Sequence, residues 1–172
     1  MIRFVPHRHL WSPACLSSAD LHVLLDTATT LDRAKQPSHG WRPLRGRRLA
    51  LLCNCADATT LSFQRAVHEL GGTMTRLDAN EWLSDAVERV PDAARMLGRL
   101  YDGIDCCDLP VPLVEQIEAH SGVPVFNGIA RPEHPLRQLI IDARAAQGAL
   151  PAALATEEQR LALQALVVCG TQ

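Results

Sequence analysis

The chain has 172 residues, 47% of them hydrophobic, which allows one sizeable core but not two full α/β domains. Its 17 basic and 19 acidic residues give a formal net charge of -2, which argues against the basic footprint of nucleic-acid binding. No apolar run approaches the ~18 residues of a membrane span, and basic residues interrupt the stretch where a signal peptide would lie. We therefore expect a cytoplasmic protein whose partners are neither membranes nor nucleic acids.

The six cysteines are too few for a disulfide scaffold at this chain length. Most of them fall in or beside apolar runs, which favours reduced thiols that act as small core side chains. A second interpretation is a zinc site or a reactive thiol built from Cys53, Cys55, Cys106 and Cys107. Because Cys53 and Cys55 lack Cys-X-X-Cys spacing, neither a metal nor another cofactor is expected.

Hydrophobic periodicity predicts alternating helices and strands. The first helix is capped by Ser17 or Ser18 and ends by Pro37, and an exposed connector is expected over residues 38–46. Four strands separated by helices predict an α/β fold, with a four-stranded parallel sheet inside a three-layer α/β/α arrangement. The predicted strands cover 49–53, 73–77, 103–107 and 123–127, and the later helices cover 61–70, 92–100, 112–121, 134–143 and 156–168.

Two of these helices have expected caps, at Asp92 and Thr156. A long polar loop is predicted over residues 78–91, with Trp82 as its one large apolar side chain. Loops of this length in a compact domain are usually functional, mobile or interface-forming.

The stretch Arg48–Gly72 organises the rest of the chain. An apolar run that ends at Cys53 is followed by a small polar turn, then by apolar residues at helical spacing, and then by Gly71-Gly72 as a stop. The pattern predicts strand, loop and helix. At such a junction in a parallel sheet, the helix start presents free N–H groups and the positive end of its dipole, which suits an anion.

Five phrases occur along the chain in a recognisable order. They are the strand, turn and Ser-Phe of residues 49–63, Leu-Gly-Gly at 70–72, Asp-Ala-Ala-Arg-Met-Leu at 92–97, Val-Pro-Val-Phe-Asn-Gly at 123–128, and His-Pro-Leu-Arg at 134–137. Together they resemble the amino-terminal, carbamoyl-phosphate-binding domain of the aspartate/ornithine carbamoyltransferases, with the ornithine branch closer. The family versions are Ser-Thr-Arg-Thr-Arg before a hydrophobe and Ser-Phe, Leu-Gly-Gly, Asp-Thr-Ala-Arg-X-Leu, Val-Pro-Val-X-Asn-Gly and His-Pro-Cys/Thr-Gln.

The resemblance also implies a domain organisation. It covers Arg8 to about Arg144, and the closing stretch is similar to the carboxy-terminal helix of ornithine carbamoyltransferases, which packs back on the first domain. It therefore implies a carbamoyl-phosphate-binding-like domain over 1–147, a short joint over 148–155 in place of the amino-acid-binding domain, and a carboxy-terminal helix over 156–172 that packs back on the domain. Because this domain makes the family's trimer contacts, the implied partners are further copies, with a trimer favoured, or a full-length carbamoyltransferase in a hetero-oligomer.

The groups that hold carbamoyl phosphate in the family are mostly replaced here. The family uses the arginine of Ser-Thr-Arg-Thr, backbone N–H groups at the helix start, a second arginine after the third strand, and the His and Gln of His-Pro-X-Gln. A dianionic phosphate needs such guanidinium groups and a positive helix end. In this chain Ala58 and Thr60 stand where the first phrase has arginines, and Thr59 alone is matched. Cys107 replaces the second arginine, and Arg137 replaces the glutamine.

The remaining positions leave several interpretations open. Asp57 would cap the helix, worth about 0.5–2 kcal/mol, and would repel a phosphate. His134 is retained, either as a donor that polarises the carbonyl or, as we favour, as a histidine that starts a helix and bonds a backbone group. Losing three charge-assisted contacts, at ~1.5–3 kcal/mol each, removes most binding unless Arg137, Arg131 or Arg89 substitutes. We expect Arg137 to be solvated or paired with a carboxylate.

Three functions are compatible with these residues. The first is a degenerate, non-catalytic carbamoyltransferase-like domain that acts as an assembly, regulatory or binding subunit. The alternative is a carbamoyltransferase of the ornithine or aspartate type that moves a carbamoyl group from carbamoyl phosphate to an amino acid, with substitute arginines or a partner chain. The third is a pocket for a neutral or cationic ligand, anchored by Asp57. Trp82 lies in the region that family members insert into a neighbouring subunit's site, although it could simply pack. No catalytic residue is assigned, and the predicted vestigial pocket comprises Asp57, Ala58, Thr59, Thr60, Cys107, His134 and Arg137.

Overall fold

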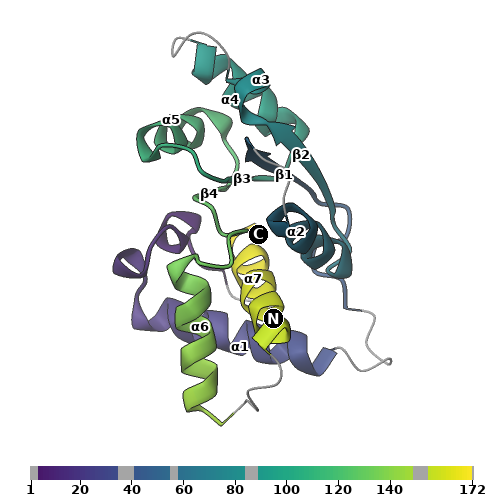
Figure 1. The fold of residues 1–172 in the computed structure, drawn as a ribbon, viewed down its shortest axis with the longest axis vertical. Coiled ribbons are helices and arrows are strands. Elements are labelled where there is room, and N and C mark those ends of the chain that lie inside the picture. The colour runs from purple at the N-terminus through teal and green to yellow at the C-terminus, as the bar shows by residue number, and fades with distance from the viewer. Residues whose placement is uncertain (1–3, 35–40, 55–57, 84–88, 149–154, 172) are drawn as a thin grey trace.

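Four parallel strands form the sheet of the structure, a computed structural model that describes residues 4–34, 41–54, 58–83, 89–148 and 155–171 (Figure 1). The strand order is β2-β1-β3-β4, and each neighbouring pair is parallel. Their bounds are Arg48–Cys53 for β1, Thr73–Asp78 for β2, Gly103–Cys106 for β3 and Val125–Phe126 for β4. The predicted parallel sheet is confirmed, although β4 is shorter than expected and Cys107 lies just beyond β3.

Helices cover both faces of this sheet, which confirms the three-layer α/β/α arrangement (Figure 1). No helix within the described ranges combines the length and apolar character needed to cross a membrane. The helices are α1 (Ser18–Ala34), α2 (Ala58–Glu69), α3 (Ala79–Trp82), α4 (Val90–Leu100), α5 (Val111–Ser121), α6 (Pro135–Ala146) and α7 (Ala155–Gly170), with short 3-10 turns η1 (His7–Leu10) and η2 (Pro13–Cys15) before them.

Of the helix caps predicted for α1, α4 and α7, the structure confirms one and corrects two. Ser17 caps α1 as predicted, because its Oγ accepts from the Asp20 N–H and the Asp20 carboxylate accepts from the Ser17 N–H, each over 3.1 Å. The predicted cap at Asp92 is wrong, since α4 begins at Val90, where Pro91 supplies a φ suited to a first turn. The cap at Thr156 is also wrong, because α7 begins one residue earlier.

Two segments expected to be irregular or exposed are more ordered. Within the predicted loop, Asp78 caps the short helix α3 by accepting from the Asn80 N–H over 2.9 Å. Trp82, at the end of α3, packs partly buried against the core on the α4 and α5 side of the sheet. In the connector before β1, Leu44 is buried and its N–H donates to the Leu70 carbonyl over 3.0 Å, so this part of the connector is not exposed.

Alternation along β1 divides the core into two halves. Leu49, Leu51 and Cys53 face α1, α2, α6 and α7, whereas Ala50 and Leu52 face α4 and α5. On the second face α4 crosses α5 closely at Gly98, where a side-chain carbon would overlap the Ser121 carbonyl. A larger residue than glycine would therefore separate these two helices.

Helix α7 occupies the centre of the larger half of the core. It contacts α1, α2 and α6, and its residues from Leu161 to Gly170 are buried on all sides (Figure 1). A helix that is apolar all round is stable only when enclosed in this way. Its ends are fixed by polar contacts, because Glu158 binds Arg144 of α6 and the Cys169 carbonyl accepts from the Val5 N–H.

Candidate functional site

The candidate site lies at the carboxyl ends of β1, β3 and β4. The strand–loop–helix unit forms as the sequence predicts, with β1 ending at Cys53 and α2 beginning at Ala58. Thr59 and Thr60 are therefore in the first turn of α2, beside the sheet edge. Asp57 falls outside the described residues, and so does the cap predicted for it.

A pocket of about 440 Å³ opens at this edge. Among the described residues that line this pocket, His134 is the one that the sequence predicted. Cys107 and Arg137 are buried away from the pocket. The structure therefore does not bring the predicted set together around one cavity. The lining residues are Cys106, Asp108, Leu109, Asn127, Gly128, Arg131, Glu133 and His134.

His134 is held as an uncharged helix cap. Its Nδ1 accepts from the Leu136 N–H over 3.4 Å at the start of α6, and its ring also bonds the backbone of Trp11. Burial, followed by the positive charge of Arg137, lowers the pKa of His134 from 6.5 to about 4. The imidazole is therefore neutral near pH 7, with both ring nitrogens engaged in structural contacts.

Cys107, which the resemblance places at the position of the family's second arginine, is a protonated core thiol. It is 2% exposed, its N–H donates to the Leu52 carbonyl over 2.9 Å, and its Sγ donates to the Asp105 carboxylate over 3.6 Å. Burial and the nearby Asp105 carboxylate raise the pKa of Cys107 well above its ordinary value. It therefore supplies neither the positive charge of an arginine nor a thiolate.

Arg137 is neither solvated nor paired with a carboxylate, so that expectation is wrong. Arg137 is 3% exposed, and its guanidinium donates to two backbone carbonyls, that of Ala130 over 2.8 Å and that of Gln159 in α7 over 2.9 Å. Burial lowers its pKa to about 10, so it remains charged at neutral pH. It therefore joins α7 to the loop after β4.

Asp105, which the sequence did not single out, supports the wall of the site from β3. Its buried carboxylate accepts from the backbone N–H groups of Gly128, Ile129 and Ala130 over 2.8–3.0 Å. Burial, only partly offset by these bonds, raises the pKa of Asp105. The signal that could have revealed it is an acidic residue in the middle of an apolar strand, because a buried carboxylate needs donors.

Arg131 is the guanidinium that faces the pocket among its described lining residues. It forms an ion pair with Asp108, directly after β3. Asp108 has a φ of 59°, in the left-handed region that non-glycine residues rarely adopt. The charge of Arg131 is thus balanced by a neighbouring carboxylate, and Glu133 adds a second carboxylate at the rim.

The cysteines do not converge on one site. Cys53 and Cys107 lie in the core on one face of the sheet and Cys106 lies on the other, because neighbouring strand residues point to opposite faces. In the described part of the chain no three His, Cys, Asp or Glu side chains are grouped as metal ligands. Cys55, the remaining member of the proposed set, lies outside that part.

Comparison with known proteins decides the ancestry. Residues 8–146 match the family described as aspartate/ornithine carbamoyltransferase, carbamoyl-P binding domain. The chain belongs to the aspartate/ornithine carbamoyltransferase family. The ornithine carbamoyltransferase of Haemophilus influenzae strain PittGG is 33% identical over 134 residues, and that of Cutibacterium acnes is 35% identical over 134 residues. Each match covers 77% of this chain but 40% of the relative.

Solved structures of carbamoyltransferases also resemble this chain over part of their length. The crystal structure of ornithine carbamoyltransferase from Gloeobacter violaceus has 32% sequence identity and a TM-score of 0.63, covering 85% of this chain and 47% of that one. The enzyme from Pyrococcus furiosus, at 23% identity and a TM-score of 0.67, supports the fold alone. The chain thus spans 40–47% of the length of these carbamoyltransferase relatives.

Proposed function

We propose that this carbamoyltransferase-family chain has no transferase activity and serves as an assembly, regulatory or binding subunit. The observation that carries the proposal is the placement of Arg137, whose guanidinium is buried and bound to two backbone carbonyls. The family has a glutamine at this position for its substrate. Here the side chain stabilises the contact with α7 instead.

The charges around the pocket support the same proposal. A dianionic phosphate is normally held by guanidinium forks and free helix N–H groups. His134 in this pocket is a neutral imidazole, Arg131 is paired with Asp108, and Cys107, buried away from the pocket, is an uncharged thiol. At the start of α6 the Leu136 and Arg137 N–H groups already donate to His134.

The proposed subunit role rests on assembly rather than chemistry. Met96 and Leu100 lie one turn apart on α4 with exposed side chains, which suits a contact with another subunit. We propose a homo-oligomer, with a trimer favoured, or a hetero-oligomer with a full-length carbamoyltransferase. The domain would extend over 1–147 and the joint over 148–155 would replace the amino-acid-binding domain, with 156–172 packing back.

The test of inactivity is ligand-induced stabilisation. Any ligand that binds the native state raises its stability, by about 2.7 kcal/mol at a ligand concentration of 100 Kd. We expect millimolar carbamoyl phosphate to leave the melting temperature unchanged and to give no carbamoylated product with ornithine or aspartate. A full-length ornithine carbamoyltransferase serves as the positive control. A saturable rise in the melting temperature would contradict the proposal.

A second candidate is a carbamoyltransferase whose site is completed by a partner chain. It is favoured by one observation, the retention of His134 on the wall of the pocket. It predicts that carbamoyl phosphate stabilises a mixture of this chain with a full-length family member more than either protein alone. No such excess, in a mixture shown by mass to contain the complex, would exclude it.

The oligomeric state is tested by light scattering on the eluting protein. We expect a mass that is a multiple of the chain mass at micromolar concentration. The double variant Met96→Glu/Leu100→Glu should dissociate the assembly while keeping the helical circular dichroism spectrum. A monomer at all concentrations, in the presence and absence of a full-length relative, would contradict the assembly role.

A further inference from the structure

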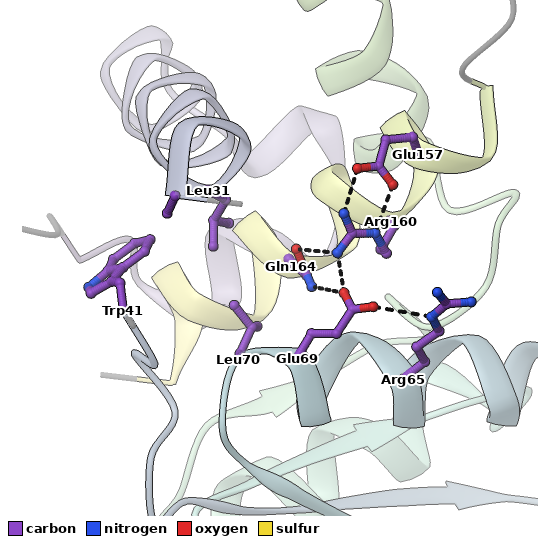
Figure 2. A pocket seen from close by; sticks show the side chains of 9 residues that line it. Leu31, Trp41, Arg65, Glu69, Leu70, Glu157, Arg160 and Gln164 are labelled. Carbon is purple, nitrogen blue, oxygen red and sulfur yellow. Dashed lines mark hydrogen bonds and ion pairs between the residues drawn. The ribbon is translucent and has the colours of Figure 1, made fainter. Parts of the chain in front are cut away.

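A second pocket, of about 340 Å³, lies away from the carboxyl edge of the sheet. It is an open pocket lined by the last turns of α1 and α2, by Trp41 in the connector and by α7 (Figure 2). Since Thr59 and Thr60 begin α2 at the carboxyl edge, this pocket at the other end of α2 is a separate site. Its volume is at the lower end of the ~300–1,000 Å³ range of small-molecule pockets.

One wall of this pocket is apolar. Leu31 of α1, Trp41 and Leu70 lie together on the same side in Figure 2. Trp41 is half-buried, so its ring is held by the fold while still facing the cavity. Such a wall favours an aliphatic or aromatic group, since burying apolar surface contributes ~25 cal/mol per Å².

The opposite wall carries alternating charges in a row from α2 to α7 (Figure 2). Arg65 donates to Glu69 over 3.1 Å, and Glu69 also accepts from Arg160 and, over 2.9 Å, from Gln164. Arg160 makes a second, two-pronged contact with Glu157 over 2.5 and 2.9 Å. Two guanidinium groups and two carboxylates leave this wall without net charge. They provide positively charged hydrogen-bond donors and negatively charged acceptors.

The row is preorganised and still has bonding capacity. Glu69 of α2 binds Arg160 and Gln164 of α7, so these three side chains are held in place before any ligand arrives. Arg65 uses its Nε for Glu69, and its side chain is 78% exposed. The terminal nitrogens of Arg65 have no partner within the described ranges, which leaves a guanidinium fork for a carboxylate.

We propose that this pocket binds a small zwitterion with an apolar side chain, of the α-amino acid class. Its carboxylate faces the terminal nitrogens of the Arg65 guanidinium, and its ammonium group faces the carboxylates of Glu69 and Glu157. Its side chain packs against the apolar wall formed by Leu31, Trp41 and Leu70. The pocket is separate from the carboxyl edge, so the proposal does not depend on whether that site binds carbamoyl phosphate.

The probe is L-phenylalanine, compared with two molecules that each lack one charge, 2-phenylethylamine and 3-phenylpropanoate. We expect L-phenylalanine to bind saturably in calorimetry and to change tryptophan fluorescence, and each single-charge analogue to bind at least roughly tenfold more weakly, as a lost charge-assisted bond predicts. Absence of saturable L-phenylalanine binding at millimolar concentration would overturn the proposal. An analogue that binds as tightly as L-phenylalanine would overturn the zwitterion assignment.

Variants locate the site. Trp41→Ala and Arg65→Gln should each weaken L-phenylalanine binding roughly tenfold, whereas Trp41→Phe should keep most of the affinity and remove the fluorescence change. Arg95→Gln is the matched control, because Arg95 is also an exposed arginine paired with a carboxylate on its own helix. If Arg65→Gln and Trp41→Phe are both folded and neither affinity nor fluorescence response differs from the parent, the pocket is not the binding site.

Discussion

Arg144 Nε donates to the Glu158 carboxylate over 2.7 Å, and both side chains are buried between α6 and α7. Arg144 also reaches α1, where it donates to Thr29 Oγ1 over 3.1 Å and to Asp32 over 3.2 Å. One guanidinium therefore connects the three helices α1, α6 and α7. This buried pair fixes the beginning of α7 against α6.

Removing one partner of this pair should be far more harmful than removing both. Arg144→Met is expected to lower the free energy of unfolding by roughly 3–5 kcal/mol, because it leaves the buried Glu158 carboxylate without its cation. The double variant Arg144→Met/Glu158→Leu should recover most of this loss. Urea unfolding measures both, and Arg8→Met, at an exposed pair with Glu118, should change stability little. Equal losses in the single and double variants would contradict a buried ion pair.

Stability should fall in mild acid because of His134. Its folded pKa of about 4 is below the ordinary 6.5, so its stabilising contribution is complete above pH 6.5 and is lost as the pH falls toward 4. The total loss is about 3 kcal/mol. His134→Asn keeps a helix-capping side chain without this titration, so its urea-unfolding free energy should fall less between pH 6.5 and 4. Identical pH profiles for the variant and the parent would refute this prediction.

Arg137 should matter for folding and not for ligand binding. Arg137→Gln removes the donors to the Ala130 and Gln159 carbonyls, and each buried acceptor left unsatisfied costs about 1–3 kcal/mol. We expect reduced stability in urea unfolding and the same absence of response to carbamoyl phosphate as in the parent chain. Carbamoyl phosphate binding by the variant but not by the parent chain would show that residue 137 reaches the pocket.

The thiols should differ sharply in reactivity. Cys15 is exposed, whereas Cys107 is buried and its pKa is raised by burial and by Asp105. Since the thiolate is the nucleophile, iodoacetamide should modify Cys15 quickly and Cys107 only when the domain unfolds. Peptide mapping over time gives both rates, and urea supplies the unfolded reference. Comparable native rates would mean that Cys107 is accessible and ionised.

Much of the fold could be predicted from the sequence, because apolar residues recur at different spacings in helices and in strands. The alternation of apolar strands with helical patterns predicted all four strands and the parallel sheet. The start of α4 was misplaced because Asp92 has the chemistry of a cap, while Pro91 fits the first turn equally well. Local signals of similar strength compete at such boundaries, and tertiary packing selects between them.

The site was harder to predict from the sequence, because its contacts join segments that are far apart along the chain. Arg137 is turned inward by a carbonyl of α7, and Asp105 matters because three N–H groups of the loop after β4 converge on it. Neither partner is visible in the local sequence. The separation of the thiols was within reach, however, since the adjacent residues Cys106 and Cys107 have to point to opposite sides of an extended segment.

The enclosure of α7 also determines when this domain can fold during synthesis. All other described elements precede α7 along the chain, yet the apolar faces of α1, α2 and α6 are covered by it. A nascent chain that ends at α6 therefore exposes the apolar surfaces that α7 covers in the folded domain, and exposed surfaces of this kind are bound by chaperones. The core on this face of the sheet is therefore complete only when α7 has been synthesised and has docked between α1, α2 and α6.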